Sequence, residues 1–192
     1  TFKKDLDAGL EFDERMWRFV RKAKKKKPYS VFLEGNHEFR MKRALDQNPT
    51  ELNGLVSFSD LNLNRNYDEV VEYTGNTPGV TRHDGVNYAH FFTSGVMGRP
   101  ISGEHPAYQL MVKQYSSCTQ AHIHTCDWST RSDPHGKRIM GLVAGVYQDY
   151  DSDWAGEVNK IWHRGVWIKR GVKDGCYDPE FISIERLKKE YS

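Results

Sequence analysis

The sequence predicts an α/β fold in a single domain of 192 residues. Two observations support this fold class. The first third contains a helical pattern, a short apolar run that ends in a sharp turn, and a second helical pattern, which is the order of an α/β crossover. The remainder is rich in short apolar runs of strand length. The length is sufficient for one buried core without disulfides or metal staples.

The first three elements are bounded by proline and glycine. An imperfect apolar stripe among charged residues predicts a helix over residues 11–26, which a proline two residues later ends. Residues 30–34 form an apolar run of strand length that stops at Gly35. A second helix is predicted over residues 37–45, closing before an Asn-Pro pair.

The later elements are mostly strands, with one helix whose apolar residues recur at helical spacing. Strands are expected over residues 69–73, 85–92, 117–124, 138–147, 165–170 and 181–184, and the helix over residues 105–115. No internal repeat, low-complexity segment or linker interrupts the sequence. These features favour one domain over residues 1–192.

The composition indicates a globular chain, with 38% hydrophobic and 28% charged residues. No apolar run is long enough to span a bilayer, and the N-terminal residues contain no apolar segment of a secretory signal. Because the first residue is Thr1 and not methionine, we expect the chain to begin inside a longer protein. The sequence has three cysteines, a small and odd number, which argues against a disulfide framework and favours a reducing, cytoplasmic compartment.

The formal charge of +2 is too small to imply a polyanionic partner. One basic cluster, residues 21–27, could contact nucleic acid. The favoured alternative is a solvated helix C-terminus, where cations complement the helix dipole.

The first chemical motif is Gly35-Asn36-His37 at the end of the predicted strand, where open α/β sheets place their ligands. The glycine permits a tight turn, the amide oxygen of Asn36 can ligate a cation, and His37 can bind metal or move a proton near neutral pH. In the alternative interpretation, Asn36 caps the following helix and His37 is an ordinary polar residue.

The second motif is His122-Ile123-His124, and in an extended chain residues two apart project to the same face. Both imidazoles could then bind one metal. A rival interpretation adds Cys118 and Cys126 to form a structural zinc site. A straight strand would spread those ends over about 26 Å, at roughly 3.3 Å per residue, so this site would need a sharp bend.

The third motif is His90, which follows an apolar strand and precedes two phenylalanines. Taken alone, a histidine in this setting is more often a hydrogen-bonded core residue than a ligand. His90 is a candidate ligand because it lies between the other two motifs along the chain.

These motifs, in this order, resemble those of the calcineurin-like metallophosphoesterases. That family's later motifs are Gly-Asn-His followed by Asp or Glu, a lone histidine after a strand, and Gly-His-x-His. Residues 35–38 match the first motif, His90 is similar to the second, and residues 121–124 are similar to the third with alanine in place of glycine. The resemblance covers roughly residues 11–145.

The resemblance implies an incomplete four-layered sandwich of mixed sheets and helices that holds two divalent cations, manganese being favoured over iron, zinc or nickel. Asn36, His90 and His122 would ligate one metal, and His124 the other. His37 would lie beside the scissile phosphate and protonate the leaving oxygen. In such a centre the cations clamp phosphate oxygens and activate a water that attacks phosphorus.

Arg40, which follows the Gly-Asn-His-Glu segment, is a candidate contact for substrate phosphate, with a surface ion pair on the helix as the alternative. Its position and the aromatic, basic C-terminal third are similar to a bacterial or bacteriophage branch of the family. A phage protein would act in the host cytoplasm.

The sequence also departs from the family pattern. The two opening motifs, Asp-x-His and Gly-Asp-x-x-Asp, supply the remaining ligands in the family, and neither lies ahead of the Gly-Asn-His segment here, so we expect an incomplete copy that binds metal weakly and catalyses poorly. Ala121 and Phe91 also stand where the family has glycine.

Three functions therefore remain open. The leading hypothesis is a metal-dependent phosphoester hydrolase, acting as a phosphatase or phosphodiesterase. A DNA-acting nuclease of the same superfamily is favoured by basic residues interleaved with aromatics in the tail. A non-catalytic remnant that binds one metal or none is the third. The tail residues concerned are Trp162, Arg164, Trp167, Lys169 and Arg170.

Overall fold

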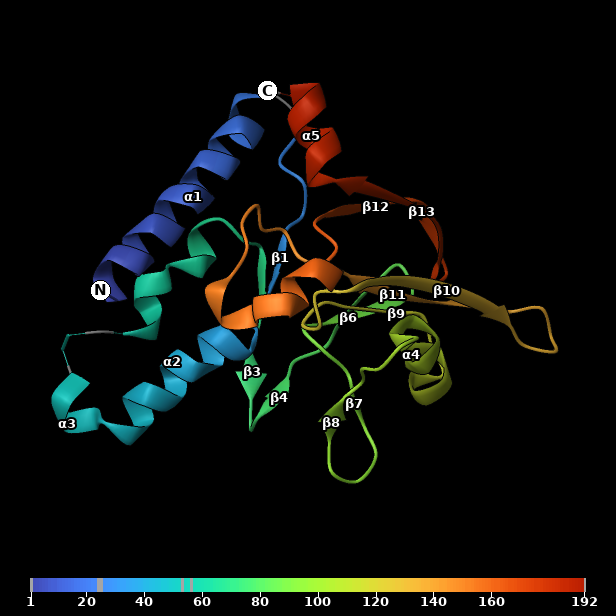
Figure 1. The fold of residues 1–192 in the computed structure, drawn as a ribbon, viewed down its shortest axis with the longest axis horizontal. Coiled ribbons are helices and arrows are strands. Elements are labelled where there is room, and N and C mark those ends of the chain that lie inside the picture. Colours follow the sequence, from blue (N-terminus) through green and yellow to red (C-terminus); the bar gives the residue numbers. More distant parts are fainter. Residues whose placement is uncertain (1, 24–25, 53, 56, 192) are drawn as a thin grey trace. The chain divides into compact units, whose positions relative to one another are not determined.

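The computed structural model is a mixed α/β structure with several small sheets and helices, which confirms the predicted fold class (Figure 1). The chain separates into two compact units, Thr1–Asn76 and Thr77–Ser192. None of the helices in the described parts is long and apolar enough to span a bilayer. The structure describes residues 2–23, 26–52, 54–55 and 57–191.

The first unit consists of helices around a short two-stranded sheet. Strands β1 and β2 pair in parallel, with Val31 opposite Glu69 and Leu33 opposite Val71. The elements are α1 (Phe2–Lys22), β1 (Val31–Leu33), α2 (Asn36–Gln47), α3 (Pro49–Leu52), the 3₁₀ helices η1 (Phe58–Leu61) and η2 (Leu63–Arg65), β2 (Glu69–Val71) and β3 (Tyr73–Thr74).

Helix α1 packs on this unit through one tryptophan. The Trp17 ring is buried and meets Tyr67 edge-on at 5.7 Å between centroids, and Tyr67 in turn lies 5.2 Å from Phe32 of β1. The Tyr67 hydroxyl donates a hydrogen bond to Asp13 at 2.8 Å. Burial and this carboxylate raise the pKa of Tyr67 to about 12.

The predicted boundaries of α1 were wrong at its start. The helix begins at Phe2, well before residue 11, because residues 3–11 favour a helix even though they carry no clear apolar stripe. The predicted basic C-terminus is confirmed for Arg21 and Lys22, which lie in the last turn. Arg21 pairs with Glu14 of the same helix, and the predicted continuation through Lys24 and Lys25 lies outside the described residues.

The second unit is built on a five-stranded sheet of order β10-β11-β9-β6-β5. The three central strands are parallel, and the edge strands β10 and β5 are antiparallel to their neighbours. Its elements are β4 (Thr77–Pro78), β5 (Thr81–His83), β6 (Val86–Ala89), β7 (Thr93–Ser94), β8 (Arg99–Pro100), α4 (Pro106–Gln114), β9 (Cys118–Gln120), β10 (Cys126–Ser132), β11 (Arg138–Ala144), η3 (Asp153–Ile161), β12 (Gly165–Lys173), β13 (Cys176–Ser183) and α5 (Ile184–Tyr191).

The two faces of this sheet carry separate cores. On one face, α4 covers side chains such as Ala89, Cys118 and Val143. On the other face, the hairpin of β12 and β13 covers alternate residues of the same strands, including Leu142 (Figure 1). Gly141 lets α4 approach closely, since a Cβ atom there would lie 2.0 Å from the Ala107 carbonyl oxygen.

Several predicted boundaries in the second unit were wrong. The strand predicted over residues 117–124 ends at Gln120, and the one predicted over 138–147 ends at Ala144, because Gly145 has a φ of 79°. The prediction missed β10, η3 and α5, and α5 begins inside the segment 181–184. The strands near residues 69, 86 and 165 and the helix near 106 are confirmed.

Candidate functional site

The Gly-Asn-His segment forms the turn between β1 and α2. Gly35 is the N-cap of α2, and its backbone N–H donates to the Glu38 side chain at 2.8 Å. Asn36 is therefore the first helical residue, and the interpretation of Asn36 as the cap was wrong. Asn36 is half-buried, while His37 is exposed. The placement of both residues directly after a parallel strand is as predicted.

A buried ion pair, not anticipated from the sequence, holds this turn. The Glu34 side chain is fully buried, accepts a hydrogen bond from the Tyr73 backbone N–H at 2.8 Å, and pairs with the Lys42 ammonium at 2.8 Å. Because Glu34 directly follows β1 and Lys42 lies on α2, this pair joins the end of the strand to the helix. The Lys42 ammonium also lies 4.1 Å from the centre of the Phe58 ring.

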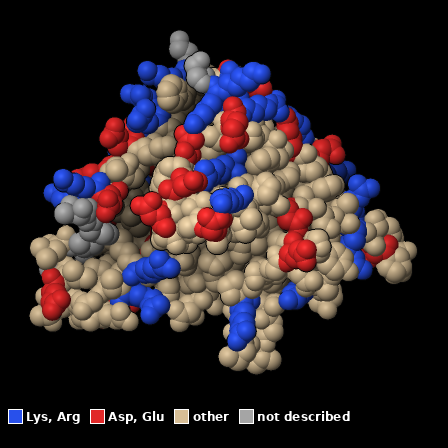
Figure 2. Space-filling view, viewed as in Figure 1, with Lys and Arg blue, Asp and Glu red and all other residues tan. Residues whose placement is uncertain are grey.

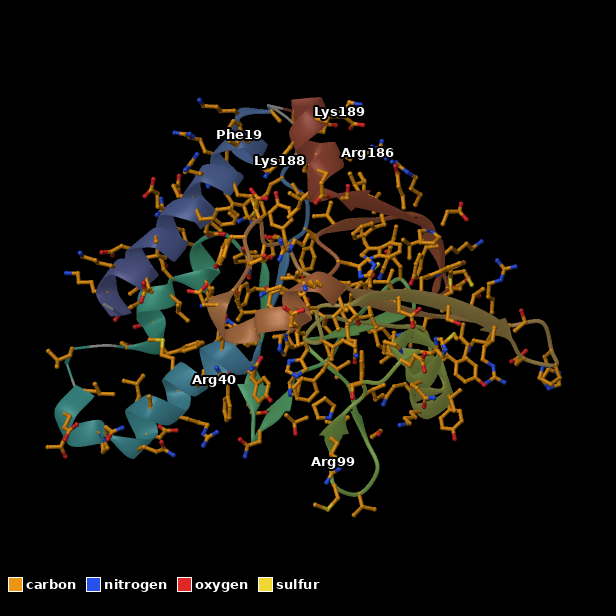
Figure 3. The ribbon with its side chains drawn as sticks, in the orientation of Figure 1. Phe19, Arg40, Arg99, Arg186, Lys188 and Lys189 are labelled. Carbon is orange, nitrogen blue, oxygen red and sulfur yellow. The ribbon has the colours of Figure 1, made fainter. Side chains whose placement is uncertain are left out.

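Arg40 lies on α2 and is exposed (Figure 3). It belongs to the first unit together with Asn36 and His37, whereas the three predicted histidine ligands belong to the second. The predicted ligand set thus draws on both units.

In the second unit, His90 and His122 lie together at the ends of neighbouring parallel strands. His90 follows β6 directly and His122 comes two residues after β9, and Ala89 lies opposite Gln120 in the register. The His122 Nδ1 and His90 Nε2 atoms are 3.1 Å apart, and the Ala121 N–H donates to the His90 carbonyl. The two histidines lie close together because each follows one of two neighbouring parallel strands.

The separation of these two nitrogens fits joint ligation of one cation. Histidine nitrogens lie about 2.0–2.1 Å from a bound zinc ion, so two nitrogens 3.1 Å apart would subtend an angle of roughly 100° at such an ion. That angle lies between octahedral and tetrahedral values. Without an ion, one of these two nitrogens must carry a proton and donate it to the other, which must be unprotonated.

The predicted geometry of the His-x-His segment was wrong. His122 and His124 have φ values of 63° and 60°, so the chain turns here and does not continue as a strand. The His124 ring packs edge-on against Trp162 at 4.4 Å, and its carbonyl accepts a hydrogen bond from the His163 N–H. The two imidazoles are therefore not aligned by strand alternation.

Gln120 positions the histidine loops and was missed by sequence reasoning. Its side chain is only 1% exposed. The amide oxygen accepts a hydrogen bond from the Phe92 N–H at 3.1 Å, and the amide nitrogen donates to the Ile101 carbonyl at 2.8 Å. Gln120 thereby ties the chain after His90 to the end of β9. A lone glutamine among apolar strand residues was the available signal.

The rival zinc site depends on Cys118, whose side chain lies in the core under α4. Burial raises the pKa of the Cys118 thiol, and burial also raises that of Cys126. A zinc ligand must be a thiolate, so this environment opposes zinc binding. Within the described residues, no group of three or more His, Cys, Asp or Glu side chains is arranged to hold a metal ion.

Several basic and aromatic residues of the tail form ion pairs or are buried within the second unit. Arg164 pairs with Asp151 at 2.5 Å, and Arg170 pairs with Glu180 at 2.7 Å. Trp162 is buried. On the face shown in Figure 2, Lys and Arg side chains are interspersed with Asp and Glu side chains. These features do not favour a groove that follows a nucleic-acid backbone.

The chain was compared with protein-family models, with curated proteins and with solved structures. No family model matches the sequence, no curated protein matches it, and no solved structure matches its fold.

Proposed function

We propose that this chain is a metal-dependent phosphoester hydrolase related to the calcineurin-like metallophosphoesterases, with an incomplete form of their four-layered sandwich. The observation that carries the proposal is the pair of imidazole nitrogens 3.1 Å apart at the ends of two adjacent parallel strands. A second strand end, with Asn36 and His37 after β1, supports it through the chemistry of its donor atoms.

Each of the candidate site residues has a proposed role. Within the second unit, His90 and His122 would hold one divalent cation, and His124 would contribute to a second. In the family that the motifs resemble, the residue matched by Asn36 is a further ligand. When bound, the cations supply charge neutralisation at phosphate oxygens and an acidified water. His37, exposed on the first turn of α2, would donate a proton to the leaving oxygen, and Arg40 would contact phosphate.

Neither of the two opening motifs of that family lies ahead of Gly35-Asn36-His37, so the bridging carboxylate that they supply in the family has no counterpart there. We therefore propose weak binding of manganese by this chain and slow hydrolysis of phosphomonoesters or phosphodiesters.

Metal binding tests the pair first. Titration with manganese(II), followed by the electron paramagnetic resonance signal of the free ion, should show binding that weakens at least about tenfold in His90→Ala and in His122→Ala. His135→Ala is the matched control, because His135 lies in an exposed turn between β10 and β11. Equal affinities in all four proteins would refute the assignment of these ligands.

Hydrolysis tests the chemistry. With manganese present, p-nitrophenyl phosphate and bis(p-nitrophenyl) phosphate should be hydrolysed above the rate of a protein-free manganese blank. His37→Ala should lower kcat by about 10²-fold or more if His37 acts as general acid. Metal binding without any hydrolysis would overturn the hydrolase and leave a non-catalytic metal-binding protein.

A further inference from the structure

A cavity of about 500 Å³ lies within the second unit, between the central sheet and β12. It is on the sheet face away from α4, and it takes no part in the proposed metal centre. The residues that line it include Tyr88, Thr119, Leu142, Val146, Trp167 and Lys169.

The cavity combines apolar walls with one amine. Leu142, Val146 and Trp167 supply aliphatic and aromatic surface. Lys169 projects from β12, and its Nζ donates hydrogen bonds to the Thr119 hydroxyl at 2.5 Å and the Tyr88 hydroxyl at 3.1 Å. An apolar site with a few convergent polar groups is the usual form of a small-molecule site, and the volume is within the usual range of roughly 300–1,000 Å³.

The Lys169 amine has aromatic neighbours and forms no ion pair with a carboxylate among the described residues. Its Nζ lies 4.2 Å from the centre of the Tyr88 ring and 4.7 Å from that of Tyr177. Burial in these surroundings lowers the pKa of Lys169 to about 7. The amine is then about half neutral at pH 7, whereas a lysine with the ordinary pKa of 10.5 is neutral in roughly one molecule in three thousand.

The titratable groups around Lys169 come from three other strands. Burial raises the pKa of Tyr88 on β6, of Cys118 on β9 and of Tyr177 on β13. All three side chains are consequently neutral at pH 7, although a charge on Cys118 would raise the pKa of Lys169.

We propose that this cavity takes a small aldehyde or ketone with an apolar body, which the Lys169 Nζ binds covalently as an imine. The carbonyl carbon would sit at the amine, and the apolar body would lie against Leu142, Val146 and Trp167. Thr119 and Tyr88 hold the nitrogen in place from the sheet.

The condensation is balanced without an oxidant or reductant. The Nζ lone pair attacks the carbonyl carbon, the C–O π bond becomes a hydroxyl, and a proton passes from nitrogen to oxygen. The carbinolamine hydroxyl then takes a proton from the Tyr88 hydroxyl and leaves as water, the C=N bond forms, and the remaining Nζ proton returns to Tyr88 to give the neutral imine. Tyr88 is placed to donate the proton that the departing hydroxyl requires, because its own hydroxyl accepts from Lys169 and remains a donor.

Reductive trapping tests this inference. The folded chain is treated at pH 7 with benzaldehyde and sodium cyanoborohydride, with EDTA present so that the result is independent of the metal centre. The rate of benzylation at each lysine is read by peptide mass spectrometry. Lys169 should be benzylated at least about tenfold faster than Lys173, an exposed lysine on the same strand, because burial lowers the pKa of Lys169 and only the neutral amine is a nucleophile.

Two further measurements distinguish a binding site for the carbonyl compound from an amine that reacts without binding it. The Lys169 rate should saturate with benzaldehyde concentration and reach half its maximum near pH 7, while the Lys173 rate stays linear in benzaldehyde. Lys169→Arg should lose the fast modification, and the matched variant Lys173→Arg should keep it, with circular dichroism checking that both fold. Equal rates at the two lysines in the unmodified sequence would overturn the proposal, whatever the variants do.

Discussion

The Gln120 side chain offers a quantitative test of how the histidine loops are held. Gln120→Leu removes the two hydrogen bonds by which the amide joins the Phe92 N–H and the Ile101 carbonyl. Leucine has a similar volume, so the substitution leaves no large cavity, but both backbone groups become buried without a partner. Each orphaned group costs about 1–3 kcal/mol, and the added apolar surface offsets part of this. We expect a net loss of about 3 kcal/mol in the free energy of unfolding.

Urea denaturation followed by tryptophan fluorescence measures this loss. Four of the five tryptophans lie in the second unit, so the signal reports mainly on the unit that contains Gln120. Gln109→Leu on α4 is the matched control, with an expected change within about 0.5 kcal/mol. If Gln120→Leu changes the free energy of unfolding no more than this control, the amide does not hold the loops as described.

Three further predictions concern packing and ionisation. Gly141→Ala should destabilise the second unit by about 1–3 kcal/mol in urea denaturation, because the new Cβ meets the Ala107 carbonyl at 2.0 Å; a neutral result would contradict this close approach. Tyr67→Phe should destabilise the first unit by about 1 kcal/mol in thermal unfolding through the lost bond to Asp13, and an unchanged midpoint would refute it. Since the folded pKa of Lys169 lies below its value of 10.5 in the unfolded chain, the unfolded state binds more protons between about pH 7 and pH 10.5. The free energy of unfolding should therefore rise with pH in that window by more in the unmodified sequence than in Lys169→Met, and parallel pH curves would refute the shift.

The sequence was sufficient to predict where its ligand candidates lie along the strands. Apolar runs that stop at a glycine or a polar residue mark strand ends, and this logic placed His37 and His90 correctly just beyond β1 and β6. It failed for the segment after β9. The left-handed conformations of His122 and His124 result from tertiary contacts, such as that of His124 with Trp162, and residue types alone do not specify them.

Elements with little apolar surface were also missed. Strand β10 is an edge strand with mostly half-buried or exposed side chains, so its sequence lacks the apolar run that identifies a central strand. Helix α5 was missed because Ile184, its first residue, was assigned to the preceding strand. Leu187 and Tyr191 continue an apolar stripe from Ile184 at helical spacing, but the helix is only eight residues long.

The order of apolar runs and turn residues by itself determined that the chain is α/β and that His37 and His90 follow strands. Only the tertiary structure decided that His90 and His122 approach to 3.1 Å, that Gln120 bridges two loops, and that Lys169 lies in an apolar cavity. The physical reason is that desolvation and side-chain contact depend on atoms contributed by strands far apart in the chain. Local propensity and periodicity describe only neighbours in sequence.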